Sequence, residues 1–320
     1  MIRTTPIKTA EQITQEKGFF HTPFFIAPNK TVFAERAARF NELALADKSD
    51  WRAYLELLAH ICEAQQAIYE SHLDNHQTRP DSAKSAFILP AADGSLIPAN
   101  TQETLLALLV HLGERVNPQL ADALQTLTKE QVEQIAGFCL GAEDSQLASE
   151  DKAYTIWLQA ALQIIWTTWA YQLQEDDVPP VEERSHCPCC GTEAVASVIM
   201  INSEVSDLRY MHCPNCNSQW NALRAKCTFC GDQSAITLQS IEGAKDGALK
   251  GARAETCDHC HAYRKLFTRR EQQYADPIAD DLASLALDIL VGEDGYHRGG
   301  HNPFLLDESD DSSGENQVLN

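Results

Sequence analysis

The chain has 320 residues, of which 44% are hydrophobic, and its formal net charge at pH 7 is −21. This length and composition allow two domains and exclude a wholly disordered chain. No apolar run reaches the roughly 20 residues that cross a bilayer, and residues 1–6 contain no apolar segment typical of a signal peptide. We therefore expect a cytoplasmic protein that does not insert into a membrane.

The first part of the chain is predicted to be helical. Residues 1–30 form a polar N-terminal arm without predicted regular structure. A helical domain follows over residues 31–176, because apolar residues recur there at three- and four-residue steps. Asp50 is expected to cap the second helix. Helices are predicted near residues 32–45, 51–68, 101–112, 117–128, 129–140 and 150–174, the last being the longest and carrying an aromatic stripe assigned to the core.

A linker over residues 177–184 ends the helical domain, because Pro179 and Pro180 lack backbone donors and restrict their neighbours. Four Cys-x-x-Cys pairs follow. Disulfides are rare in the cytosol, so paired spacing favours metal ligation. A tetrahedral site needs four ligands, and two pairs must therefore combine to form each site.

Chain spacing predicts which pairs combine. Between Cys190 and Cys213 lie 22 residues, enough for a hairpin, whereas only 10 separate Cys216 from Cys227. We therefore predict two tandem Cys₄ modules, over residues 185–223 and 224–275. The predicted metal ligands are Cys187, Cys190, Cys213 and Cys216 in the first module, and Cys227, Cys230, Cys257 and Cys260 in the second.

The residue after each pair supports metal-binding turns, which usually need a positive φ at that position. Glycine accepts this conformation freely, and Asn and His tolerate it better than most residues. The four positions hold Gly191, Asn217, Gly231 and His261. Strands are predicted over residues 195–201, 208–212, 236–241 and 253–256.

Residues 276–306 are predicted to form a C-terminal helix and loop, and residues 307–320 an acidic disordered tail. The helix should begin at Asp280 or Asp281 and end at Gly292. Its apolar face would contain Leu282, Leu285, Ala286, Ile289 and Leu290. The predicted fold class is α plus small β, with an all-α domain, two ribbon-like Cys₄ modules and a final helix.

Charge and motifs narrow the function. Residues 184–275 contain 11 Lys and Arg against 9 Asp and Glu, so the cysteine region lacks the basic surface that binds nucleic acid. A four-cysteine site has no open position for a reactive water, and we find no catalytic motif. We therefore expect no enzyme activity. Cys189 is assigned as a spare thiol, and Cys62 and Cys139 as inert core thiols. His60, His72 and His76 are assigned to the surface, and His186 and His212 to hydrogen bonds that support the metal ligands.

Taken together, these motifs resemble the formate dehydrogenase accessory protein FdhE family. The stretches that carry the resemblance are Cys187-Pro188-x-Cys190-Gly191, Arg209-Tyr210-x-His212-Cys213-x-x-Cys216-x-x-x-Trp220, Arg224-x-Lys226-Cys227-x-x-Cys230, Glu255-x-Cys257-x-x-Cys260, residues 279–285 and residues 302–305. The resemblance covers most of the chain and is weakest before residue 30 and in the tail.

The resemblance implies rubredoxin-like modules with iron at both Cys₄ sites, for which zinc is a common substitute. It also implies a maturation factor that binds the catalytic subunit of formate dehydrogenase. Homodimer formation is a further option. Alternative functions are a rubredoxin-like electron carrier and, less favoured, a zinc-ribbon nucleic-acid binder. The side chains expected to contact or tune a client are Arg209, Trp220, Arg224, Tyr263 and those of residues 296–304.

Overall fold

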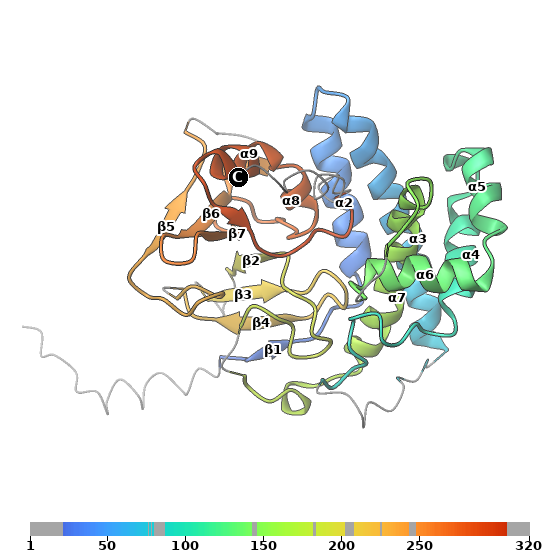
Figure 1. The fold of residues 1–320 in the computed structure, drawn as a ribbon, viewed down its shortest axis with the longest axis horizontal. Coiled ribbons are helices and arrows are strands. Elements are labelled where there is room, and N and C mark those ends of the chain that lie inside the picture. The colour runs from blue at the N-terminus through green and yellow to red at the C-terminus, as the bar shows by residue number, and fades with distance from the viewer. Residues whose placement is uncertain are drawn as a thin grey trace, which may run out of the picture.

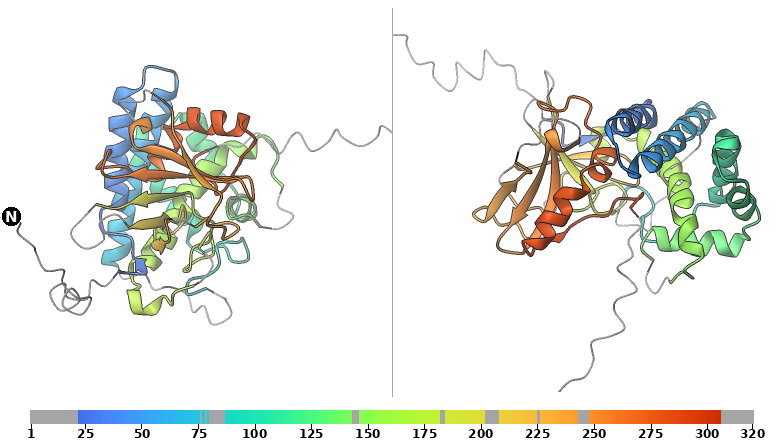
Figure 2. Two further views of the ribbon diagram at one scale, coloured as in Figure 1. Left: turned by 90° about the vertical axis from the view of Figure 1, so that its left-hand side faces the viewer. Right: turned by 90° about the horizontal axis from the view of Figure 1, so that it is seen from above.

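The computed structural model describes residues 22–75, 77, 79, 87–142, 146–181, 184–201, 208–224, 226–242 and 248–305. The predicted tail over residues 307–320 and residues 1–21 of the predicted arm lie outside these ranges. A helical region and a single mixed sheet stand side by side, as Figures 1 and 2 show from three directions. This arrangement confirms the predicted fold class.

The helical region contains α2 (Val32–Ala46), α3 (Trp51–Asp74), α4 (Thr101–Leu112), α5 (Pro118–Gln125), α6 (Lys129–Cys139) and α7 (Thr155–Tyr171). Short 3₁₀ turns occupy Gly113–Arg115, Asp151–Tyr154 and Glu175–Asp177. A helix forms within residues 150–174, but the prediction that it is the longest was wrong: among the described residues α3 has 24 residues against 17 in α7. The 3₁₀ turn before α7 shortens that helix.

Helix α7 is the centre of the helical region. Every residue from Ile156 to Ala170 is buried, because α3, α4 and α6 all pack against this helix. Among its polar side chains, Gln163 Oε1 accepts a 2.9 Å hydrogen bond from Gln65, the residue that interrupts the apolar stripe of α3. Asp50 stands at the N-cap position of α3, but its side chain makes no capping hydrogen bond.

The sheet contains β1 (Phe25–Ile26), β2 (Ala196–Ile199), β3 (Arg209–His212), β4 (Gln219–Ala222), β5 (Ile236–Gln239), β6 (Ala252–Cys257), β7 (Ala262–Thr268) and β8 (His297–Arg298). Its strand order is β1-β4-β3-β2-β7-β6-β5, and β8 pairs with β7. The two cysteine modules meet where β2 pairs parallel to β7, in the register Ala196 to Lys265. Both modules therefore contribute strands to one sheet. The predicted domain boundaries stay predictions.

The prediction that residues 1–30 contain no regular structure is wrong at Phe25 and Ile26. Phe25 and Ile26 form β1, which pairs antiparallel to β4 at the sheet edge. The Phe25 side chain is buried, and Phe24 is partly buried against the same core. This aromatic patch therefore extends the sheet.

The predicted C-terminal helix is two helices, α8 (Ala279–Leu282) and α9 (Leu285–Glu293). Ser284 interrupts them, and its hydroxyl donates a 2.6 Å hydrogen bond to the Asp280 carbonyl. The break shifts the helical phase, which leaves Ile289 63% and Leu290 48% exposed while Leu282, Leu287 and Val291 are buried. Gly292 lies inside α9 and does not end it.

Buried ion pairs join α8 to both parts of the molecule. Arg39 of α2 donates to Asp280 at 2.5 Å, and Lys265 of β7 lies 3.2 Å from Asp281. Both aspartates are fully buried inside α8, which begins at Ala279, one residue before the predicted start at Asp280 or Asp281. In the described part of the chain, no helix is both long and apolar enough to cross a membrane.

Candidate metal centres

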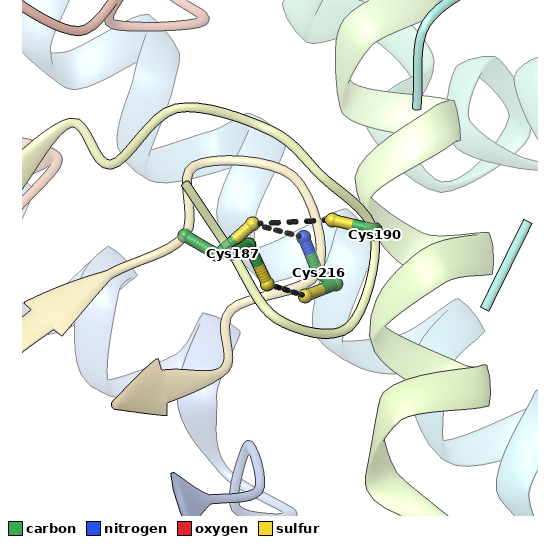
Figure 3. Close-up of side chains that lie close together, drawn as sticks. Cys187, Cys190 and Cys216 are labelled. Carbon is green, nitrogen blue, oxygen red and sulfur yellow. Dashed lines mark hydrogen bonds between the residues drawn. The ribbon is translucent and has the colours of Figure 1, made fainter. Parts of the chain in front are cut away.

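The first centre is formed by two turns that face each other. Cys187 and Cys190 precede β2, and Cys213 and Cys216 lie between β3 and β4. The Sγ atoms of Cys187 and Cys216 are 3.6 Å apart, and those of Cys190 and Cys213 are 3.5 Å apart. All four residues are buried. Three of them are seen converging beside α7 in Figure 3.

The second centre repeats this arrangement at a more open place. Cys227 and Cys230 precede β5, and Cys257 and Cys260 flank the turn between β6 and β7. The Sγ separations are 3.8 Å between Cys227 and Cys260 and 3.7 Å between Cys230 and Cys257. Cys230 is exposed and Cys260 is half-buried. The two centres therefore share a geometry and differ in their access to solvent.

These separations fit a metal ion better than disulfides. A tetrahedral ion with metal–sulfur bonds of about 2.3 Å places its sulfurs about 3.8 Å apart, whereas a disulfide bond is about 2.05 Å long. All four sulfurs of each cluster lie within 4.8 Å of one another. The eight sulfurs thus form two complete sets suited to hold metal ions, grouped in the sequential pairing.

Backbone hydrogen bonds shape the turns. The Cys189 N–H donates to Cys187 Sγ at 3.4 Å, and the Cys216 N–H donates to Cys213 Sγ at 3.3 Å. Such donors stabilise thiolate charge. The residue after each pair has the predicted positive φ: 80° at Gly191, 57° at Asn217, 78° at Gly231 and 54° at His261.

Three further cysteines, Cys62, Cys139 and Cys189, belong to neither four-sulfur set. Cys189 is buried with its carbonyl bound by the Leu89 N–H at 2.9 Å. Burial raises the pKa of both the Cys62 and Cys139 thiols to about 12, which keeps them protonated. The two are therefore poor nucleophiles.

The two histidines predicted to support the first centre each lie within hydrogen-bond distance of a polar side chain. His212 Nε2 lies 3.3 Å from Asn217 Oδ1, and burial together with nearby Arg36 lowers the His212 pKa to about 4. His186 Nδ1 lies 2.8 Å from the Ser185 hydroxyl. His212 therefore interacts with the residue that follows Cys216, the last cysteine of the first centre.

The distant histidines form no ligand set in the described part of the chain. His60 Nδ1 lies 3.3 Å from Glu63 at the surface. His72 is half-buried, and His76 lies outside the described residues.

Several residues expected to contact a client are instead internal. Trp220 and Tyr263 are buried in the core, and Phe304 is fully buried. Arg209 is also buried, and its Nη1 lies 2.8 Å from Glu255. Arg224 is exposed. The buried four therefore support the fold, and sequence pattern alone could not separate these roles.

Comparison with known proteins finds similarity to a single family over residues 22–305. Three family models match it: FdhE, N-terminal, over residues 22–183; FdhE, central domain, over 186–224; and FdhE, C-terminal domain, over 225–305. A protein FdhE homolog of Haemophilus influenzae (strain PittEE) is 32% identical over 307 residues, which cover 94% of this chain and 97% of that protein. A homolog of Pectobacterium atrosepticum is 33% identical, with coverages of 96% and 98%.

A solved structure agrees. The crystal structure of the FdhE protein from Pseudomonas aeruginosa superposes with a TM-score of 0.72 at 31% sequence identity. The match covers 88% of this chain and 99% of that one. Similarity in sequence and in fold therefore extends over nearly the full length of both chains.

Proposed function

Because this chain belongs to the FdhE family, we propose that it is an accessory factor that binds the catalytic subunit of formate dehydrogenase and is needed for its assembly or activation. The observation that carries this function is the pair of complete four-sulfur clusters. A complete set leaves no ligand position for a reactive water, which supports a binding role over hydrolysis. We propose that the chain acts in the cytoplasm and has no catalytic activity of its own. A homodimer could serve the same accessory role.

We propose that the eight clustered cysteines bind two metal ions, with iron in the cell and zinc as its substitute in overproduced protein. Four thiolates in a tetrahedron suit both metals. Iron would supply one-electron exchange when bound, whereas zinc would supply structure alone. The turns that hold the sulfurs, with their N–H donors, support ligation by thiolates.

Metal analysis tests this assignment. Protein purified without oxygen from cells that make it at its native level is expected to contain two metal ions per chain, one for each cluster. Ferric iron, formed by mild oxidation of the purified chain, would give visible thiolate-to-metal absorption, which zinc lacks. A metal content well below one ion per chain would contradict ligation by the clusters, and a colourless protein with two zinc ions would contradict iron.

Capture of the client tests the accessory role. A tagged chain expressed at its native level in anaerobically grown cells is expected to recover the catalytic subunit of formate dehydrogenase. The matched control is the same bait in cells that lack that subunit. Formate dehydrogenase that matures normally when the chain is deleted, together with no recovered subunit, would refute the proposed function.

One observation favours electron transfer as a second candidate. Cys230 brings a sulfur of the second cluster to the surface, so a redox partner could approach that centre closely. An iron-loaded chain would then exchange electrons reversibly with a small redox protein. Loss of this exchange in a Cys230→Ser variant, with client capture intact, would favour the electron carrier.

A further inference from the structure

We propose that Arg36 and Asn217 are positioning residues for the first centre, so that its metal ion joins the helical region to the sheet, whereas the metal ion of the second centre can exchange without disturbing that junction. Metal ligation by the eight cysteines, as proposed above, is the premise. The two metal ions would then have different roles. The first would stabilise the interface between the helical region and the sheet, and the second would exchange with solution.

Asn217 follows the last cysteine of the first centre and has a φ of 57°. Glycine would meet this backbone demand at lower cost, so the side chain needs a separate reason. Asn217 is 1% exposed. Its Oδ1 accepts a 2.7 Å hydrogen bond from Arg36 of α2, and its Nδ2 donates a 2.8 Å hydrogen bond to Thr167 of α7. The amide thus ties the metal-binding turn to two helices.

Arg36 extends this connection to the C-terminal segment. Its guanidinium is fully buried, and its Nε donates to both carboxylate oxygens of Asp276, at 3.1 and 3.2 Å. Asp276 in turn accepts from the N–H groups of Ile278 and Ala279 at the start of α8. One side chain therefore contacts the turn of the first centre and the segment that begins α8.

The helical region also binds the backbone of both turns of the first centre. Leu89 and Ala92 donate their N–H groups to the carbonyls of Cys189 and Cys190, at 2.9 and 2.8 Å. Gln163 of α7 donates a 2.7 Å hydrogen bond to the Pro214 carbonyl. Opening the metal-sulfur cluster would move these carbonyls away from their donors. Release of this metal is therefore coupled to loosening of the interface.

The second centre has a different surrounding. His261 holds the position that matches Asn217, but its side chain is exposed and its ring lies 6.0 Å from that of Tyr296. The backbone bonds described for its turns go to neighbours within residues 226–305, such as that from the His297 N–H to the His261 carbonyl at 2.8 Å. Its metal can leave without moving the helical region.

Two glycine variants give a matched test, since glycine keeps the positive φ at either position. Zinc-loaded full-length chain is mixed with excess 4-(2-pyridylazo)resorcinol, and release is followed by absorbance. The wild-type chain is expected to release one zinc quickly and one slowly. Asn217→Gly should speed the slow phase about tenfold or more, because it removes two buried hydrogen bonds. His261→Gly should leave the slow phase unchanged.

Thr167→Val provides a milder variant if Asn217→Gly does not fold, since it removes only the hydroxyl that accepts from Asn217. It should also speed the slow phase selectively. An unchanged slow phase in the folded variants, or equal acceleration by His261→Gly, would overturn the proposed division. A chain that binds no zinc would instead refute metal ligation itself, which separates the two failures.

Discussion

Replacing Cys187 and Cys190 together by serine is expected to abolish folding, whereas the same change at Cys227 and Cys230 should leave a folded chain with one metal ion. Structural zinc contributes roughly 10–16 kcal/mol of apparent binding free energy, and a domain is stable by only about 5–15 kcal/mol. The first cluster lies within the buried core that contains Trp166. Loss of the first cluster therefore removes contacts between the helical region and the sheet.

Circular dichroism melting and metal content per chain measure this difference. The second-centre variant should melt cooperatively and bind about half the wild-type metal. Cys139→Ser is the control, because this thiol lies outside both clusters and should retain both metal ions and the wild-type melting curve. A first-centre variant that melts like the wild-type chain would contradict a structural role for that centre.

Cysteine spacing made the centres predictable, because local turn geometry decides which sulfurs can meet. The positive φ values also follow from sequence, since few residue types occupy that conformation at low cost. The same local rules predicted most helices, whose buried faces recur at helical spacing. These features depend on neighbours within a few residues or on short hairpins.

The shared sheet depends on contacts that no local pattern contains. The predicted strands do not include β7, whose centre holds Arg264 and Lys265, two charged residues that are unusual in the interior of a sheet. The structure pairs these cations with acidic groups: Arg264 lies 3.0 Å from Glu193, and Lys265 lies 3.2 Å from Asp281. Partners brought from elsewhere in the chain make a charged central strand acceptable.

Loss of one such partner is expected to be the costliest single substitution outside the cysteines. Asp281→Asn should lower the free energy of unfolding by about 3–5 kcal/mol, the range for breaking a buried ion pair on one side. Asp281 is fully buried, 3.2 Å from Lys265 and 2.5 Å from Arg298. Lys265 and Arg298 share two carboxylates, those of Asp281 and Asp288, and asparagine at position 281 would remove the charge of the fully buried one.

Urea unfolding at pH 7 measures this loss. Burial raises the pKa of Asp281, but Lys265 and Arg298 lower it further, and the net pKa lies below its ordinary value. A depressed carboxyl pKa stabilises the fold at pH values above the unfolded pKa of about 3.9. The Asp281 contribution is therefore fully present at pH 7 and is lost as the pH falls through the folded pKa.

The exposed pair between Arg52 and Glu56 provides the matched control. Its side chains are 49% and 45% exposed and lie 2.8 Å apart, one turn along α3. Glu56→Gln should cost less than about 1 kcal/mol, because water screens a surface pair. An Asp281→Asn chain that loses no more stability than this control would show that the cations around α8 find other partners, and that the ion pairs do not fix α8 to the sheet.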